Sequence, residues 1–188
     1  MSTARLIYSM LVSLDGYSAD QSGGFGWAQP ATDVHAHVNE LARSVGTSLY
    51  GRRMYATMAG WETDPGLAAS SPLLADFAQL WQAADKIVYS TSLTDVVTAR
   101  TRIERSFDVA ADRELKTAAA ADLNVSGPEL AAHALRAGLV DELQVYVVPV
   151  VVGGGTAYLP TDVRLDLELI DERRFADGTV FLRYRVRP

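Results

Sequence analysis

The chain of 188 residues contains no cysteine, which excludes disulfides, thiol catalysis and every metal site that depends on a cysteine ligand. It also has no excess of positive charge, because 17 Lys and Arg residues stand against 23 Asp and Glu residues and give a net charge of −6. A general nucleic-acid-binding protein needs a basic face to neutralise phosphates, so we expect no nucleic-acid partner. A small basic pocket for one anionic ligand is still compatible with this charge.

Long apolar runs are also missing. The segment from Met1 to Leu14 shows no basic stretch followed by a long apolar run, and no part of the chain approaches the roughly 18 apolar residues of a membrane span. We therefore expect no membrane partner and a cytoplasmic location. The sequence contains no internal repeat and no low-complexity linker. A chain of this length buries about 70% of its surface on folding, so we expect a single domain over residues 1–188.

The first half of the chain alternates between strand and helix patterns. Arg5 to Leu14 is a nearly continuous apolar run ended by Asp15-Gly16, typical of a strand buried on both faces. A polar, Gly-rich loop precedes a helix that we expect to begin with Asp33 as N-cap and to end at Gly46. Its apolar stripe consists of Val34, Val38, Leu41 and Val45. Further strands are expected at residues 48–50, 86–89, 123–125 and 143–152, and further helices at 73–84, 112–121 and 129–137.

The end of the chain follows a different pattern. Apolar and charged residues alternate over residues 163–169 and 180–186, and Asp177-Gly178 between them is a hairpin signal. Pro149 lacks a donor for the ladder, so we expect a bulge or an edge at that point. The whole pattern predicts an α/β fold with a mostly parallel sheet and an antiparallel hairpin at its C-terminal end.

Three predicted strands end in turns suited to anionic ligands, which in open parallel sheets bind at the carboxyl edge. Glycine, arginine, serine and a helix start can all approach or bind phosphate. Each turn also has a purely structural interpretation: solvated arginines, capping hydroxyls, or a well-formed turn into a helix. The turns consist of Gly51, Arg52, Arg53 and Met54; of Ser90, Thr91 and Ser92; and of Ser126, Gly127, Pro128, Glu129 and Leu130. None has the spacing of a Rossmann or P-loop motif.

Taken in order, these turns resemble the dihydrofolate reductase-like family, and within it the branch that includes the C-terminal reductase domain of bacterial riboflavin biosynthesis enzymes. The resemblance spans residues 5 to about 185. It rests on the residues Ser13-Leu14-Asp15-Gly16-Tyr17, Gly51-Arg52-Arg53-Met54-Tyr55, Lys86-Ile87-Val88-Tyr89-Ser90, Ser126-Gly127-Pro128-Glu129-Leu130, and the run from Gly138 through Pro149 to Gly155.

The resemblance implies a three-layer sandwich with helices on both faces of the sheet, and an NADPH-dependent reductase. It places the phosphates of NADPH at Gly51 to Met54, its adenosine ribose and 2′-phosphate near Ser90 to Ser92, and its pyrophosphate at Ser126 to Leu130. The family usually has two adjacent glycines where this chain has Ser126-Gly127. The added hydroxyl either narrows the approach of the pyrophosphate or forms a hydrogen bond with it.

On the substrate side, the resemblance points to the loop and helix that follow the first strand. Asp15 and His35 are the candidates for acid–base catalysis, and each has an alternative, in a turn for Asp15 and at the surface for His35. Phe25 and Trp27 either stack on a planar ring or anchor the loop. Asp33 and Tyr55 complete the candidate substrate contacts. His35 and His37 lie on opposite flanks of one helix, so we expect no metal site.

These observations lead to two hypotheses. The first is an NADPH-dependent oxidoreductase that transfers hydride to a small planar heterocycle, pterin- or pyrimidine-like, or to a carbonyl compound. The second is a non-catalytic protein on the same fold that binds a nucleotide or another small ligand. We expect a homodimer that pairs near the apolar strand from Val145 to Val152 and the glycines at 153–155.

Overall fold

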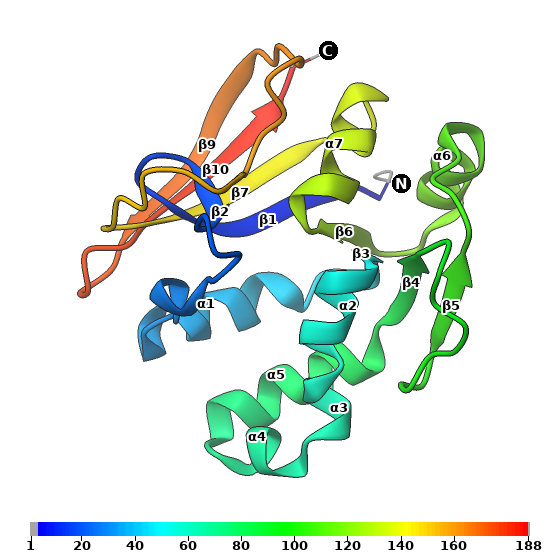
Figure 1. The fold of residues 1–188 in the computed structure, drawn as a ribbon, viewed down its shortest axis with the longest axis horizontal. Helices are drawn as coiled ribbons and strands as arrows, with labels where there is room; N and C mark the ends of the chain where they lie inside the picture. The colour runs from blue at the N-terminus through cyan, green and yellow to red at the C-terminus, as the bar shows by residue number, and fades with distance from the viewer. Residues whose placement is uncertain (1–3, 188) are drawn as a thin grey trace.

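The computed structural model describes residues 4–187, and its centre is an eight-stranded sheet in the order β5-β4-β3-β6-β1-β7-β10-β9 (Figure 1). Strands β5, β4, β3, β6, β1 and β7 are parallel, and β10 lies antiparallel between β7 and β9. The predicted α/β fold with an antiparallel C-terminal hairpin is confirmed. The strands are β1 (Leu6–Ser13), β3 (Val45–Gly51), β4 (Asp85–Tyr89), β5 (Thr101–Glu104), β6 (Asp122–Ser126), β7 (Glu142–Val148), β9 (Leu167–Arg174) and β10 (Val180–Val186).

Helices cover both faces of this sheet, as the resemblance implied. In Figure 1, α1 and α5 lie on one side of the sheet and α7 on the other. No helix within residues 4–187 combines the length and apolar composition needed to cross a bilayer. The helices are α1 (Thr32–Ala42), α2 (Arg52–Met58), α3 (Gly60–Thr63), α4 (Pro65–Ala69), α5 (Pro72–Ala83), α6 (Val109–Ala118) and α7 (Pro128–Arg136), with a 3-10 turn η1 (Gly26–Ala28) before α1.

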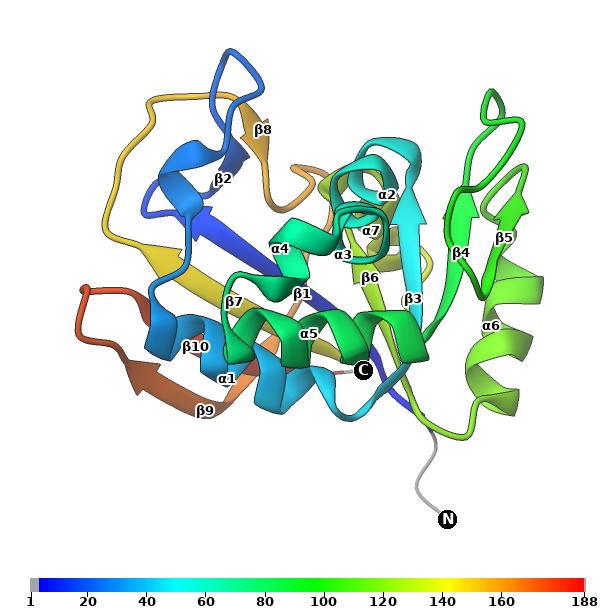
Figure 2. The ribbon, with the colours of Figure 1, turned by 90° about the horizontal axis from the view of Figure 1, so that it is seen from below.

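A small second sheet of β2 (Tyr17–Ala19) and β8 (Thr156–Ala157) lies at the end of β1 (Figure 2). It brings the glycine loop 153–155 against the start of the chain's first long loop. A Cβ at Gly155 would lie 2.1 Å from the Ala19 carbonyl oxygen, so only glycine fits there. These strands have only three and two residues, too few to show a hydrophobic period, so they could not be predicted from the sequence.

Buried apolar side chains explain the order of the layers. One face of β1, through Leu6, Tyr8 and Val12, packs in the same cluster as Leu130 and Leu135 of α7. Leu11, on the opposite face, packs with the α1 cluster. Alternation of side chains along a strand puts both sets in the core. The nearly continuous apolar run of the first strand is therefore explained by burial on both faces.

Several predicted boundaries are wrong. α1 begins at Thr32 with Ala31 as its N-cap, so Asp33 is not the cap. α1 also ends at Ala42, and Gly46 lies within β3, where a Cβ would approach the Ala121 Cβ to 2.9 Å. This glycine therefore serves close packing between segments and does not end a helix.

Other corrections are smaller. The helix expected at 112–121 covers Val109–Ala118, because Asp108 caps it by accepting from the backbone of Ala110 and Ala111. β9 begins at Leu167 and not at 163, and β7 ends at Val148, so Pro149 follows the strand and interrupts no ladder. Gly138 closes α7 with a φ of +62° and Gly178 forms the hairpin turn with a φ of +90°, as expected.

His37 joins α1 to the antiparallel end of the sheet. Its Nδ1 lies 3.0 Å from the Tyr146 hydroxyl, and its ring contacts those of Phe181 and Phe175, with centroids 4.5 and 5.5 Å away. Burial lowers the pKa of His37, and the positive charge of Arg173 adds to the effect. The neutral imidazole is therefore the form that the folded protein favours.

We predict that the free energy of unfolding declines as the pH falls below about 6.5, the pKa of histidine in an unfolded chain. The unfolded chain binds more protons there than the folded one, so acid favours unfolding. Urea denaturation at pH 7.5 and 5.5 measures this. A His37→Phe variant should lose much of the pH dependence, whereas His133→Phe, at an exposed position, should keep it. An unchanged pH dependence in His37→Phe would contradict the assignment.

Candidate functional site

The candidate site lies at the carboxyl edge of the parallel strands. Register places the ends of β3 and β4 side by side, with Gly51 opposite Tyr89, and Tyr50 of β3 opposite Ser126 of β6. On the other side of β1, Ser13 lies opposite Val148 at the end of β7. From β1 the chain first builds the strands on one side, β3 to β6, and later crosses to β7 on the other side. This reversal of the strand order opens a crevice that can bind ligands.

The turns after β3 and β6 are brought together. A Cβ built on Gly127 would lie 3.6 Å from the Cβ of Met54, and Arg53 Nη1 lies 3.6 Å from Glu129 Oε1. This ion pair is almost fully exposed, so it adds little stability. Arg52 is exposed as well. The turns after β3 and β6 therefore adjoin at this surface, where the guanidinium groups of Arg52 and Arg53 are exposed.

The start of α7 offers backbone donors to this surface. Pro128 occupies the first turn and no side chain within residues 4–187 caps the helix, while Gly127 ahead of it has a φ of +96°. A residue other than glycine is strained at that φ. The amides of Glu129 and Leu130 belong to the uncapped first turn, which favours anions through its N–H groups and the helix dipole.

The turn after β4 is built around one buried hydroxyl. Ser90 Oγ accepts from the backbone N–H groups of Ser92 at 3.3 Å and Leu93 at 3.0 Å, whereas Thr91 and Ser92 are exposed. Arg105, directly after β5, donates from Nη1 to the carbonyl oxygens of Ser90 at 3.1 Å and Leu93 at 2.7 Å. Arg105 was not among the residues predicted from the sequence, because β5 has only four residues and shows no hydrophobic period. The signal that could have identified it is a basic residue directly after a strand.

The Asp15 carboxylate binds backbone N–H groups of the loop after β7. Its two carboxylate oxygens accept from Val152 N at 3.1 Å and Gly153 N at 2.8 Å. The Ser13 hydroxyl, followed by these backbone N–H groups, lowers the pKa of Asp15. The side chain is therefore an anion at neutral pH, and it fastens the loop after β7 to the end of β1.

His35 is a residue of α1, and its ring contacts Phe77 of α5. The Asn39 side-chain amide donates to Leu73 O at 3.0 Å and Asp76 Oδ2 at 2.8 Å, so its oxygen accepts from His35 Nδ1 at 3.1 Å. This contact favours the tautomer with the proton on Nδ1 and leaves Nε2 as the basic nitrogen. The ring also contacts Trp61 and Phe77 edge-on, with centroids 6.0 and 5.4 Å away.

The four predicted substrate residues separate into two groups. Tyr55 of α2 is buried, and its hydroxyl bonds with Thr98 Oγ1 at 3.0 Å and Val97 N at 2.9 Å, so it has no surface for a substrate. Asp33 accepts from Val34 N and, at 3.3 Å, from Ala176 N in the β9–β10 turn. The fold itself uses both polar groups. Tyr55 therefore needs correction as a substrate contact, because it is buried, whereas the half-buried Asp33 stays a prediction.

The aromatic residues of the first long loop are more accessible. Phe25 is 47% exposed, and Trp27 donates from Nε1 to Gly24 O at 3.2 Å. The Trp27 ring is therefore held within its own loop, while the face of Phe25 is open to contact. Within residues 4–187 no group of three or more His, Asp or Glu side chains is placed to hold a metal ion.

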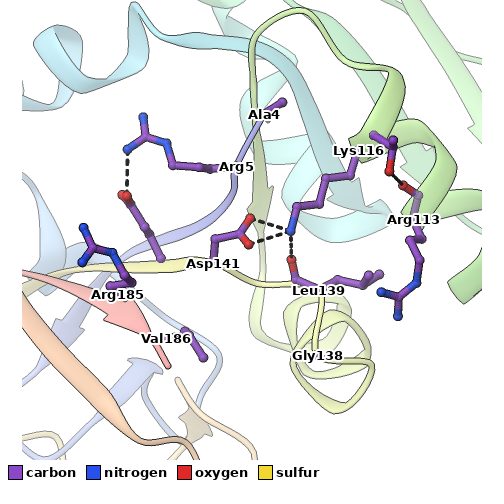
Figure 3. Close-up of a pocket in the computed structure, with 11 residues that line it drawn as sticks. Ala4, Arg5, Arg113, Lys116, Gly138, Leu139, Asp141, Arg185 and Val186 are labelled. Carbon is purple, nitrogen blue, oxygen red and sulfur yellow. Dashed lines mark hydrogen bonds and ion pairs between the residues drawn. The ribbon is translucent and has the colours of Figure 1, made fainter. Parts of the chain in front are cut away.

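A pocket of about 560 Å³ lies at the opposite, amino edge of the sheet (Figure 3). Several of its charges are paired: Lys116 lies 2.6 Å from Asp141, and Arg5 lies 2.7 Å from Glu142. Arg183 also contacts Glu142, at 2.8 Å. This network neutralises the buried carboxylate of Glu142 and joins β1, β7 and α6. It has no contact with the turns at the carboxyl edge.

A second pocket, of about 540 Å³, adjoins the candidate site. It runs along the outer side of α7 from Pro128 and Glu129 to Arg136, opposite Leu159. The start of α7 is thus accessible from two directions, from the sheet edge and from this groove.

Comparison with known proteins finds a matching family model and a curated relative. The model of the family described as RibD C-terminal domain matches residues 4–181. A Bacillus subtilis (strain 168) protein named "Uncharacterized protein YyaP" is 22% identical over 187 residues, which cover 96% of this chain and 94% of that protein.

Solved structures agree in fold. A Shewanella sp. PV-4 protein named for riboflavin biosynthesis superposes with a TM-score of 0.77 at 19% identity, covering 98% of this chain and 99% of that one. Acinetobacter baumannii RibD gives 0.68 at 17% identity, covering 99% of this chain but 59% of the larger protein. A pyrimidine reductase-like protein from Corynebacterium diphtheriae gives 0.63 at 15% identity, covering 98% and 92%. Identities this low establish the fold alone.

We predict that Asp15→Ala releases the loop after β7. Loss of two hydrogen bonds to a carboxylate should speed the exchange of the Val152 and Gly153 amide hydrogens by about tenfold. Hydrogen exchange read by NMR measures this directly. Asp20→Ala is the control, because among residues 4–187 the Asp20 carboxylate accepts only from Ser22 and Gly24 of its own turn. Equal protection of Val152 and Gly153 in the wild type and in Asp15→Ala would show that Asp15 does not hold the loop.

Proposed function

The chain belongs to the RibD C-terminal domain family, and from this premise we propose that it is an NADPH-dependent reductase. It would transfer hydride to a small planar heterocycle, pterin- or pyrimidine-like, or to a carbonyl compound. Relatives named as a riboflavin biosynthesis protein and a pyrimidine reductase-like protein support the choice of substrate class. A homodimer and a cytoplasmic location stay predictions.

The observation that carries the proposal is the meeting of the β3 and β6 turns at the carboxyl edge. The contact between Gly127 and Met54 and the pairing of Arg53 with Glu129 put two arginines beside the uncapped start of α7. Cationic side chains and helix N–H groups are the donors that bind a pyrophosphate. In this proposal Gly51, Arg52, Arg53 and Met54 bind it from one side, and residues 126–130 from the other.

The space at these turns fits a nucleotide. A Cβ built on Gly51 would meet no atom within 4 Å, so a ligand has room to approach the backbone there. Gly127 lacks a Cβ where the chain turns into α7. Ser90, Thr91 and Ser92 would bind the adenosine ribose and its 2′-phosphate, and Arg105 adds a positive charge to that turn. NADPH, when bound, supplies the hydride, and the protein supplies orientation.

On the substrate side, the exposed ring of Phe25 is suited to stack on a planar molecule, with Trp27 behind it in the same loop. Of the two catalytic candidates, Asp15 uses both oxygens on backbone N–H groups. His35 keeps its basic nitrogen, Nε2, outside the Asn39 contact, so it is the better candidate of the two to take up and pass on a proton.

The alternative is a nucleotide-binding protein without catalysis on the same fold. The commitment of the Asp15, Asp33 and Tyr55 polar groups to internal hydrogen bonds favours it. The two functions differ in one property: only the reductase oxidises bound NADPH when a suitable heterocycle is added.

We predict that NADPH binds saturably at sub-millimolar concentration. A titration monitored by tryptophan fluorescence measures this binding. The Arg52→Ala, Arg53→Ala double variant should weaken NADPH binding by at least about fivefold, since each lost charge-assisted hydrogen bond reduces affinity. Arg164→Ala is the matched control, an exposed arginine paired with Asp166. Equal affinity in the double variant would show that the phosphate site lies elsewhere, and absence of binding by the wild type would refute the reductase.

A second prediction concerns the choice between NADPH and NADH. Arg105→Ala should reduce the preference for NADPH by about threefold or more, because a phosphate dianion loses a nearby cation. The affinity for NADH should change less, since NADH has no 2′-phosphate. Arg102→Ala, a neighbouring arginine paired with Glu104, should leave the ratio unchanged. Isothermal titration with both cofactors gives the ratio, and an equal drop for both would assign Arg105 to general folding of the turn.

A further inference from the structure

Asn124 and Ser126 form a polar pair on β6. The neighbouring residues Leu123 and Val125 pack with α7, so Asn124 and Ser126 point to the opposite face of the sheet. Asn124 Nδ2 donates to Ser126 Oγ at 2.9 Å. Ser126 is the last residue of β6, directly before Gly127 and α7, and only 9% of it is exposed.

The fold does not account for Asn124. β6 lies between β1 and β3, where parallel strands covered on both faces are normally apolar throughout. Asn124 lies opposite Ile7 on one side and Ser48 on the other. Its Oδ1 is buried without a hydrogen-bond partner among residues 4–187. An unpaired buried acceptor lowers stability, and a valine or leucine at this position would avoid that loss.

The direction of the bond gives Asn124 a use. A serine hydroxyl has one hydrogen to donate, and an amide N–H that occupies one of its lone pairs leaves this hydrogen available for another acceptor. Phosphate oxygens only accept at neutral pH. A Ser126 hydroxyl oriented in this way is therefore a donor at the end of β6, one residue before the Gly127 turn into α7.

We infer that Asn124 is a positioning residue that orients the Ser126 hydroxyl toward the pyrophosphate of the cofactor. This rests on the proposed function, and it adds a residue that the three turns do not contain. It also explains how serine replaces a glycine at this turn without blocking phosphate: the side chain that narrows the approach becomes a ligand. The unpaired Oδ1 of Asn124 lowers the stability of the fold, while its Nδ2 directs the Ser126 hydroxyl toward the ligand.

The test is a double-mutant cycle read by NADPH affinity and by thermal unfolding. Asn124→Leu and Ser126→Ala should each raise the NADPH dissociation constant by about three- to tenfold, the effect of one hydrogen bond. The double variant should bind no more weakly than the weaker single variant, because both changes remove the same contact. Asn124→Leu should also unfold at the same or a higher temperature, since it removes the unpaired acceptor. A merely structural asparagine would show the reverse, lower stability with unchanged affinity.

Controls separate the possible failures. Ser48→Ala changes the buried neighbour of Asn124 on β3 and should leave NADPH affinity unchanged. Asn124→Val, a strand former, is used if Asn124→Leu does not fold. Wild-type affinity in Ser126→Ala, or additive effects in the double variant, would overturn the role of Asn124 while the reductase proposal stands. Absence of NADPH binding by the wild type would overturn both.

Discussion

The parallel hydrogen bonding of β6 and β7 to the two sides of β1 is the interaction on which the candidate site depends. The chain leaves β1 for the β3 side first, reaches β6, and only then crosses to β7. The ends of these three strands therefore lie together at one edge, although Ser13, Ser126 and Val148 are far apart in the sequence. A crevice at such a reversal is a property of the topology, and the side chains around it decide which ligand it accepts.

Most polar groups at this edge are used by the protein itself. Asp15 holds the loop after β7, Asp33 holds the β9–β10 turn, and Arg105 holds the turn after β4. This arrangement makes the edge rigid, and a rigid edge presents its donors to a ligand at little entropic cost. Asn124 is the exception, because its buried Oδ1 has no hydrogen-bond partner among residues 4–187. An unpaired atom at this depth is most simply explained by a role beyond folding.

The elements with a strong period could be predicted from the sequence. The apolar run of β1, the start of α7 at Pro128 and the hairpin turn at Gly178 are local signals, because burial on both faces, a fixed φ and a positive φ each restrict the residue type. Gly46 shows the limit of such signals. A glycine after an amphipathic stretch indicates a helix end, but here it makes room for Ala121, which is 75 positions further along the chain.

The same division applies to the site. The turns that carry glycine, arginine and serine could be recognised in the sequence, because close approach to a backbone and binding of an anion each admit few residue types. Which polar side chains near these turns are accessible depends on tertiary contacts. Tyr55 and Asp33 have suitable chemistry and yet are committed to Val97, Thr98 and Ala176, and Arg105 joins the Ser90 turn from a strand too short to recognise. A polar group can bind a ligand only if its neighbours in space leave one of its donors or acceptors without an internal hydrogen bond, and those neighbours are distant in sequence.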